Sequence, residues 1–124
     1  MNYKEICKVL VQAAEDHGLP VTLDAIFGRN IRINLGFSKK EREKSIDELE
    51  LSVRSQNALK RSGIDTFDDL IGILAEGKLK SIRNLGAKSF REIQTKLLVY
   101  GFECLTEKGK QDYFREVVEL NCQG

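Results

Sequence analysis

The chain has 124 residues, of which 41% are hydrophobic and 31% are charged, and its formal net charge is +1. This length allows one ordinary domain, or a small domain with an extension. The small net charge excludes nucleic-acid binding driven by overall positive charge, so any such site must be a local patch. The three cysteines and the single histidine lack the spacing of a disulfide framework or a metal site. With no signal peptide or long apolar run in the sequence, we expect a cytoplasmic protein.

The first predicted element is an amphipathic helix over residues 3–17. Apolar residues recur there every three or four positions, and Gly18 followed by Pro20 fits a helix end. His17 lies in the last turn, where the helix dipole favours a positive charge, and it has no companion for catalysis or metal binding.

Residues 20–36 leave two alternatives open. Apolar and polar residues alternate over 31–35, which favours a small β-hairpin with its turn at residues 28–30. Thr22 could instead cap a short helix that runs to Phe27.

A charged connector follows at residues 38–47 and provides the best candidate for a domain boundary. We therefore divide the protein into a module at 1–37, the connector, and a helical domain at 48–124. Ser38 and Glu41 have the spacing of a capping box, which predicts that part of the connector is helical.

Four helices are predicted after the connector. The first covers residues 54–62, and the second begins after Thr66, whose side chain would cap it. The third covers 87–100, with Gly101 as its cap, and the last covers 108–121. The apolar sides of the last two helices are formed by Phe90, Ile93, Leu97 and Leu98, and by Tyr113, Phe114, Val117, Val118 and Leu120.

Two runs of opposite charge stand out in this part of the protein. Residues 78–96 hold six basic residues against one acid, Glu92, whereas residues 41–50 hold five acids against two bases. Each run is also what the solvated face of a helix would show, so charge alone does not assign a function to either.

The spacing of Gly72, Gly77 and Lys78 imitates a nucleotide phosphate loop. The next position is Leu79, where such a loop needs a Ser or Thr to hold magnesium, which excludes this interpretation. The sequence also offers neither a catalytic triad nor a pair of carboxylates near a plausible cleft. We therefore expect neither an enzyme nor a cofactor.

The stretch IRNLGAKSFREI, residues 82–93, predicts a grip on a phosphate. Gly86 would supply a tight turn, Lys88 the charge and Ser89 a hydroxyl donor, and the helix that follows would direct its positive end at the anion. The alternative is a plain helix start with a solvated lysine.

Two stretches carry a specific resemblance: LELSVRSQNALKRSGI at 49–64 and RNLGAKS at 83–89. In this order they resemble the carboxy-terminal domain of the bacterial RNA polymerase alpha subunit, over about residues 44–102. The resemblance implies a mainly α fold, a compact bundle of short helices with a helix-hairpin-helix-like core. It also implies binding to the minor groove of A/T-rich DNA upstream of promoters, and contacts with sigma factors and activators.

The resemblance further implies that Arg54 enters the minor groove with Asn57 beside it. A narrow A/T minor groove has an enhanced negative potential, which favours an inserted arginine. The same resemblance assigns the phosphate backbone to the turn at residues 84–89, and places Glu92 near the DNA. The predicted DNA-binding residues are Arg54, Asn57, Asn84, Gly86, Lys88, Ser89 and Glu92.

Residues 1–37 and the tail after about 103 lie outside the resemblance, so we expect a free-standing relative with its own N-terminal module. The leading hypothesis is a DNA-binding module in transcription. An alternative is a protein-interaction module that docks on a sigma factor, RNA polymerase or a regulator through residues 41–50 or the first helix, without binding DNA. A third hypothesis is a homodimer formed through the first helix.

Overall fold

A computed structural model describes residues 1–20, 22, 26–27 and 31–122. Its elements are α1 (Tyr3–Asp16), α3 (Lys39–Arg42), the 3₁₀ turn η1 (Ile46–Leu49), α4 (Val53–Arg61), α5 (Phe67–Ala75), the 3₁₀ turn η2 (Leu79–Ser81), α6 (Ala87–Glu103) and α7 (Glu107–Cys122). No β-strand forms among the described residues, so the predicted mainly α fold is confirmed. None of these helices is long and apolar enough to cross a membrane.

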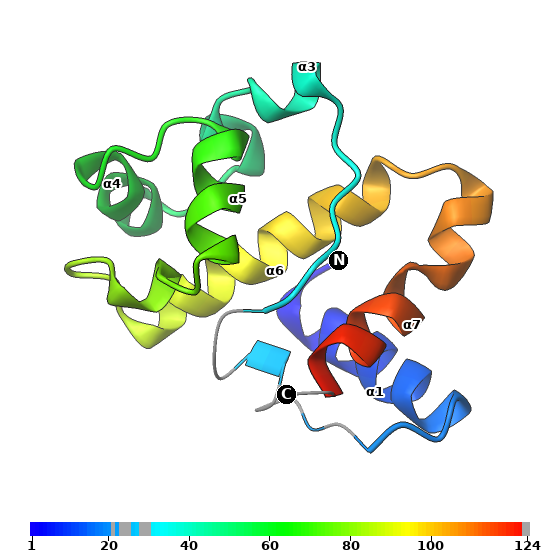
Figure 1. The fold of residues 1–124 in the computed structure, drawn as a ribbon. Helices are drawn as coiled ribbons and strands as arrows, with labels where there is room; N and C mark the ends of the chain where they lie inside the picture. The colour runs from blue at the N-terminus through cyan, green and yellow to red at the C-terminus, as the bar shows by residue number, and fades with distance from the viewer. Residues whose placement is uncertain (21, 23–25, 28–30, 123–124) are drawn as a thin grey trace.

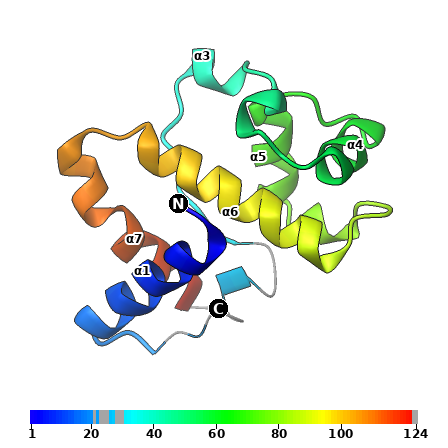
Figure 2. The same cartoon turned by 180° about the vertical axis from the view of Figure 1, so that it is seen from behind.

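The long helix α6 runs through the middle of the molecule. Helices α4 and α5 lie on one side of it, and α1 and α7 lie together on the other (Figures 1 and 2). Helix α1 packs along α7 and also contacts α6, while α4 packs on the first half of α6. This arrangement brings the starts of α1, α4 and α6 to neighbouring places on the surface.

The helix starts follow the predicted capping signals. Ser38 and Glu41 form a reciprocal capping box at α3, and Thr66 and Asp69 form another at α5. At the end of α1, Gly18 adopts a φ of +63°, the left-handed conformation expected of a helix cap. The helices predicted from these signals are therefore confirmed at these positions.

One hydrophobic core joins the two sides of α6. Its fully buried side chains come from α1, η1, α4, α5, α6 and α7, and they include Ile6, Leu10, Ile46, Leu59, Leu70, Leu97 and Val118. Burying a leucine or isoleucine of this kind stabilises the fold by roughly 1.5–3 kcal/mol. The packing of α1 into this core does not test the predicted boundary at 38–47, which stays a prediction.

The predicted end of α6 at Gly101 is wrong, because the helix continues through this glycine to Glu103. A Cβ atom at position 101 would lie 2.5 Å from Leu35 Cδ2 and 2.8 Å from the Tyr113 hydroxyl. The Tyr113 hydroxyl donates a hydrogen bond to the Leu98 carbonyl at 2.7 Å, which fixes it beside the glycine. Gly101 is therefore required by close packing and does not act as a helix cap.

The strand predicted at residues 31–35 is also wrong, while the predicted hairpin turn at 28–30 lies outside the described residues. In a hairpin, the backbone of this segment would form hydrogen bonds with a second strand. Here it forms hydrogen bonds with side chains instead. The Ile31 N–H donates to Gln94 Oε1 at 2.6 Å, and Asn121 accepts from the Arg32 N–H and donates to its carbonyl. Of the alternative helix, Ile26 and Phe27 are described and helical.

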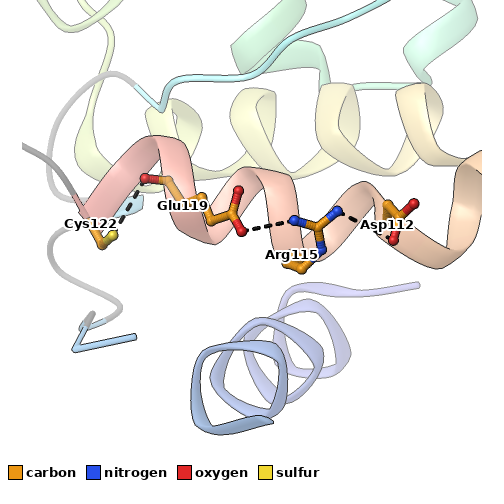
Figure 3. Close-up of polar contacts among 4 residues, drawn as sticks. All are labelled: Asp112, Arg115, Glu119 and Cys122. Carbon is orange, nitrogen blue, oxygen red and sulfur yellow. Dashed lines mark hydrogen bonds and ion pairs between the residues drawn. The ribbon is translucent and has the colours of Figure 1, made fainter. Parts of the chain in front are cut away.

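Helix α7 has a mixed surface. Asn121 is buried, and its side chain forms hydrogen bonds with the Arg32 backbone. Leu120, which was predicted on the buried side, is 39% exposed. On a partly exposed side, Arg115 lies between Asp112 at 3.3 Å and Glu119 at 2.8 Å (Figure 3). Such pairs stabilise a helix by only about 0.3–0.5 kcal/mol each. The position of α7 is therefore set by its apolar contacts with α1 and α6.

Candidate nucleic-acid interface

The start of α4 presents the first part of the predicted site. Ser52 caps this helix, since its hydroxyl accepts a hydrogen bond from the Ser55 N–H at 3.3 Å. Arg54 is the second residue of the helix and Asn57 follows one turn later. Both side chains are exposed, and their spacing of three places them next to each other on the helix surface.

The start of α6 presents the second part. Asn84, which precedes Gly86 in the predicted tight turn, has a φ of +65° and is the left-handed residue of this turn. Gly86 is the residue before the helix, with φ −77° and ψ 169°, and the N–H groups that follow it receive no cap from a side chain. Apart from its neighbours in the chain, no atom lies within 4 Å of the place where its Cβ would be, so space is open beside this helix start for an approaching anion.

Glu92 ties these two helix starts together. Its Oε2 accepts from the Ser52 N–H at 3.0 Å, and its Oε1 accepts from the hydroxyls of Ser52, at 2.8 Å, and Ser55. The carboxylate on α6 therefore holds the first turn of α4, from which Arg54 projects. In this structure Glu92 fixes the relative position of the two helix starts.

The environment of Glu92 favours its charged form. Burial alone would raise the pKa of this carboxyl, but the hydrogen bonds from Ser55 and Ser52 outweigh burial and Lys96 adds to them. The pKa of Glu92 consequently lies below its ordinary value. The negative charge is thus retained at neutral pH and is directed at the serines of α4.

A groove of about 700 Å³ lies where α4, α6 and the start of α1 meet. Its lining brings together five of the seven predicted site residues, namely Arg54, Gly86, Lys88, Ser89 and Glu92. Asn57 and Asn84 do not line the groove. Both side chains are exposed, and both residues are close in sequence to residues that line it. Lys88 is exposed, whereas Ser89 is only 6% exposed.

Seven further residues of the groove lining were not among the predicted site residues. Ser52 belongs to the α4 side, Arg91, Thr95 and Lys96 extend the α6 side, and Met1, Asn2 and Tyr3 form a third wall. Arg91 and Lys96 could have been found from the sequence, because helical spacing places them on the same face as Lys88. No local pattern in the sequence indicates that residues 1–3 form the third wall, because only the packing of α1 against α6 brings them to the groove.

The groove is positively charged. It is lined by the cations Arg54, Lys88, Arg91 and Lys96 and by the single carboxylate of Glu92. Within the part of the protein that the structure describes, none of these four cations forms an ion pair within 4.0 Å. The arrangement therefore offers free positive charge and an uncapped helix start to the same ligand, which fits a phosphate backbone.

The family model for the C-terminal domain of the bacterial RNA polymerase alpha chain matches residues 37–98, half of this protein. The protein belongs to this family. The resemblance seen in the sequence is thereby confirmed, and the matched residues include α3, α4, α5 and most of α6. The groove wall formed by residues 1–3 lies outside them.

Similar proteins include DNA-directed RNA polymerase alpha subunits. That of Rubrobacter xylanophilus is 52% identical over 60 residues, covering 48% of this chain and 19% of the relative. That of Alkaliphilus oremlandii is 54% identical over 61 residues, with the same coverage, and that of Onion yellows phytoplasma is 43% identical over 86 residues, covering 65% and 24%. The protein thus spans about a fifth of the length of these relatives. No solved structure matches it significantly.

Proposed function

We propose that this protein is a non-catalytic DNA-binding module in transcription, with Arg54 in the minor groove of A/T-rich DNA. The observation that carries the proposal is the groove, which places the Arg54 side of α4 beside Lys88 and the uncapped start of α6. An arginine suits the narrow, strongly negative A/T minor groove, and a helix start with a lysine suits the adjoining phosphates. Family membership supports the same assignment.

Affinity should be modest and dependent on salt. The exposed cations of the groove and the α6 start can neutralise about three to five phosphates. The logarithm of the association constant should then fall against the logarithm of salt concentration with a slope between about −2.7 and −4.5. Such a module would act in the cytoplasm of a bacterial cell, where it reaches chromosomal DNA.

The test is a fluorescence anisotropy titration of A/T-rich and G/C-rich duplexes at two salt concentrations. We expect the wild-type protein to prefer the A/T-rich duplex, and Arg54→Ala to lose this preference. Arg61→Ala is the matched control, because Arg61 is an exposed arginine of the same helix that does not line the groove. Equal preference in wild type and Arg54→Ala would contradict the proposed site.

A second candidate function is docking on a sigma factor, RNA polymerase or a regulator. It is favoured by Glu43, Glu48 and Glu50, which are exposed and form no ion pair within the described part of the protein. Co-purification of polymerase subunits with Arg54→Ala, but not with a variant that carries glutamine at the three acids, would support it. A homodimer through α1 would need a face other than its apolar stripe, because Ile6, Leu10 and Ala14 are buried within the protein.

A further inference from the structure

The groove continues past the predicted DNA-binding residues along one face of α6. Lys88, Arg91 and Lys96 all line it, since Arg91 follows Lys88 by three residues and Lys96 follows it by eight, which places the three within a sector of about 140° of the helix surface. From Lys88 to Lys96 the helix rises by about 12 Å. This length equals the axial rise of about three to four phosphates on one strand of DNA.

Arg91 is held in place by the first helix. Its guanidinium lies over the ring of Tyr3, 4.4 Å from the ring centroid, and the Tyr3 ring contacts Phe27 edge-to-face at 5.3 Å. Phe27 belongs to the core and is only 6% exposed. A series of contacts therefore runs from the core through Tyr3 to an arginine that lines the groove.

Stacking on an aromatic ring restricts an arginine while using few of its hydrogen-bond donors, and a further hydrogen bond between Arg91 and the Tyr3 hydroxyl adds to this restriction. A guanidinium that lies on a ring keeps the N–H groups at its edges available to a phosphate. Because the side chain is already restricted, less conformational entropy is lost when it binds. Glu92, the acid next to Arg91 in the sequence, does not occupy it, since its oxygens accept hydrogen bonds from Ser52 and Ser55.

We propose that Arg91 is a further phosphate-binding residue of this interface and that Tyr3 positions it. This inference rests on the proposed function, because it extends the same DNA contact along α6 towards Lys96. The first turn of α1 then takes part in DNA binding, although it lies outside the residues that the family model matches. The ligand is the phosphate backbone of duplex DNA, read without regard to sequence.

The test measures the salt dependence of anisotropy with an A/T-rich duplex for wild type, Arg91→Gln and the control Arg61→Gln. We expect Arg91→Gln to reduce the steepness of the salt slope by about 0.9, the contribution of one phosphate. At 0.1 M salt its affinity should be up to about eightfold lower than that of wild type. This factor is the change in affinity that a slope of about 0.9 produces between 1 M and 0.1 M salt. Preference for A/T over G/C should stay unchanged, and Arg61→Gln should behave like wild type.

Tyr3 is tested by Tyr3→Leu and Tyr3→Phe. Leucine keeps apolar contact with Phe27 but removes the ring face, so the affinity should fall by less than in Arg91→Gln, with the salt slope unchanged. Phenylalanine keeps the ring face and loses only the hydroxyl contact with Arg91, so its affinity should lie closer to wild type than that of Tyr3→Leu. Thermal unfolding of each variant shows whether the fold is intact at the temperature of the titration.

The outcomes separate this inference from the proposed function. If Arg54→Ala loses the A/T preference while Arg91→Gln keeps the wild-type slope, only the role of Arg91 is refuted. If Tyr3→Leu binds more tightly than wild type, the first turn of α1 obstructs the groove, and the positioning role is refuted. If the wild-type protein binds neither duplex, both the proposed function and this inference fail.

Discussion

The two sides of α6 (Figure 1) share one hydrophobic core but differ in the polar groups that they present. On the side of α4, the carboxylate of Glu92 joins the two helix starts through hydrogen bonds from two serines, and cations remain exposed around it. On the side of α1 and α7, buried apolar side chains dominate, and the Tyr113 hydroxyl is fixed on the α6 backbone. The two sides therefore differ in exposed charge: cations gather around the joined helix starts on the α4 side, whereas the α1–α7 side contributes mainly buried apolar side chains.

The largest effect on stability should come from the apolar side. Leu10 of α1 is fully buried, so Leu10→Ala should lower the free energy of unfolding by about 2–5 kcal/mol. Val11, its neighbour, is 40% exposed, and Val11→Ala should change this free energy by less than about 1 kcal/mol. Urea unfolding measures both. If the two variants were equally stable, the Leu10 face of α1 would not be packed into the core.

A smaller effect is expected where α6 meets α7. Gly101→Ala should lower the free energy of unfolding by about 1–3 kcal/mol, because the new methyl group meets the Tyr113 hydroxyl, which its hydrogen bond to Leu98 fixes. Gly72, in α5, has open space around it, so Gly72→Ala should stabilise the protein by up to about 1 kcal/mol. Thermal or urea unfolding distinguishes the two signs. A stabilising Gly101→Ala would mean that Gly101 is not closely packed.

The smallest of these effects tests the polar side and depends on pH. Because the pKa of Glu92 is lowered in the folded state, its contribution is present above the ordinary glutamate pKa, about 4.3. That contribution is lost as the pH falls below this value through the lowered pKa. Glu92→Gln should cost about 1–2 kcal/mol at neutral pH, and this difference from wild type should shrink towards pH 3.

The control for Glu92 is Glu43→Gln, since Glu43 is an exposed acid of the connector without an ion pair among the described residues. We expect it to change the free energy of unfolding by less than about 0.5 kcal/mol. Urea unfolding from pH 3 to pH 7 measures both variants. A difference for Glu92→Gln that does not vary with pH would contradict the hydrogen-bonded, charged carboxylate.

Local signals in the sequence were sufficient for most of the helices. Capping boxes such as Thr66 with Asp69 and apolar spacing such as that of α6 act within a few residues, so they can be read directly. Gly101 was misinterpreted because glycine has two uses, ending a helix and admitting a close neighbour. Only the positions of Leu35 and Tyr113, which lie in other parts of the chain, decide between them.

Long-range pairing explains the other differences. Gln94 and Asn121 are distant in sequence from residues 31–32, yet their side chains bind the backbone of these two residues. The segment 31–35 therefore forms no strand, although its apolar and polar residues alternate. In the groove, the resemblance to a known family identified the α4 and α6 parts of the lining. The Tyr3 contact with Arg91 depends on how α1 folds back onto α6, for which no local pattern exists.

The most direct test of the central claim is amide chemical-shift mapping of the ¹⁵N-labelled protein during titration with an A/T-rich duplex at low salt. The largest changes should occur at Arg54 in α4 and at Ala87, Lys88 and Ser89 at the start of α6, while the amides of α7 stay unchanged. Changes confined to α7 or to the connector at 38–47, with none at the groove, would contradict this claim.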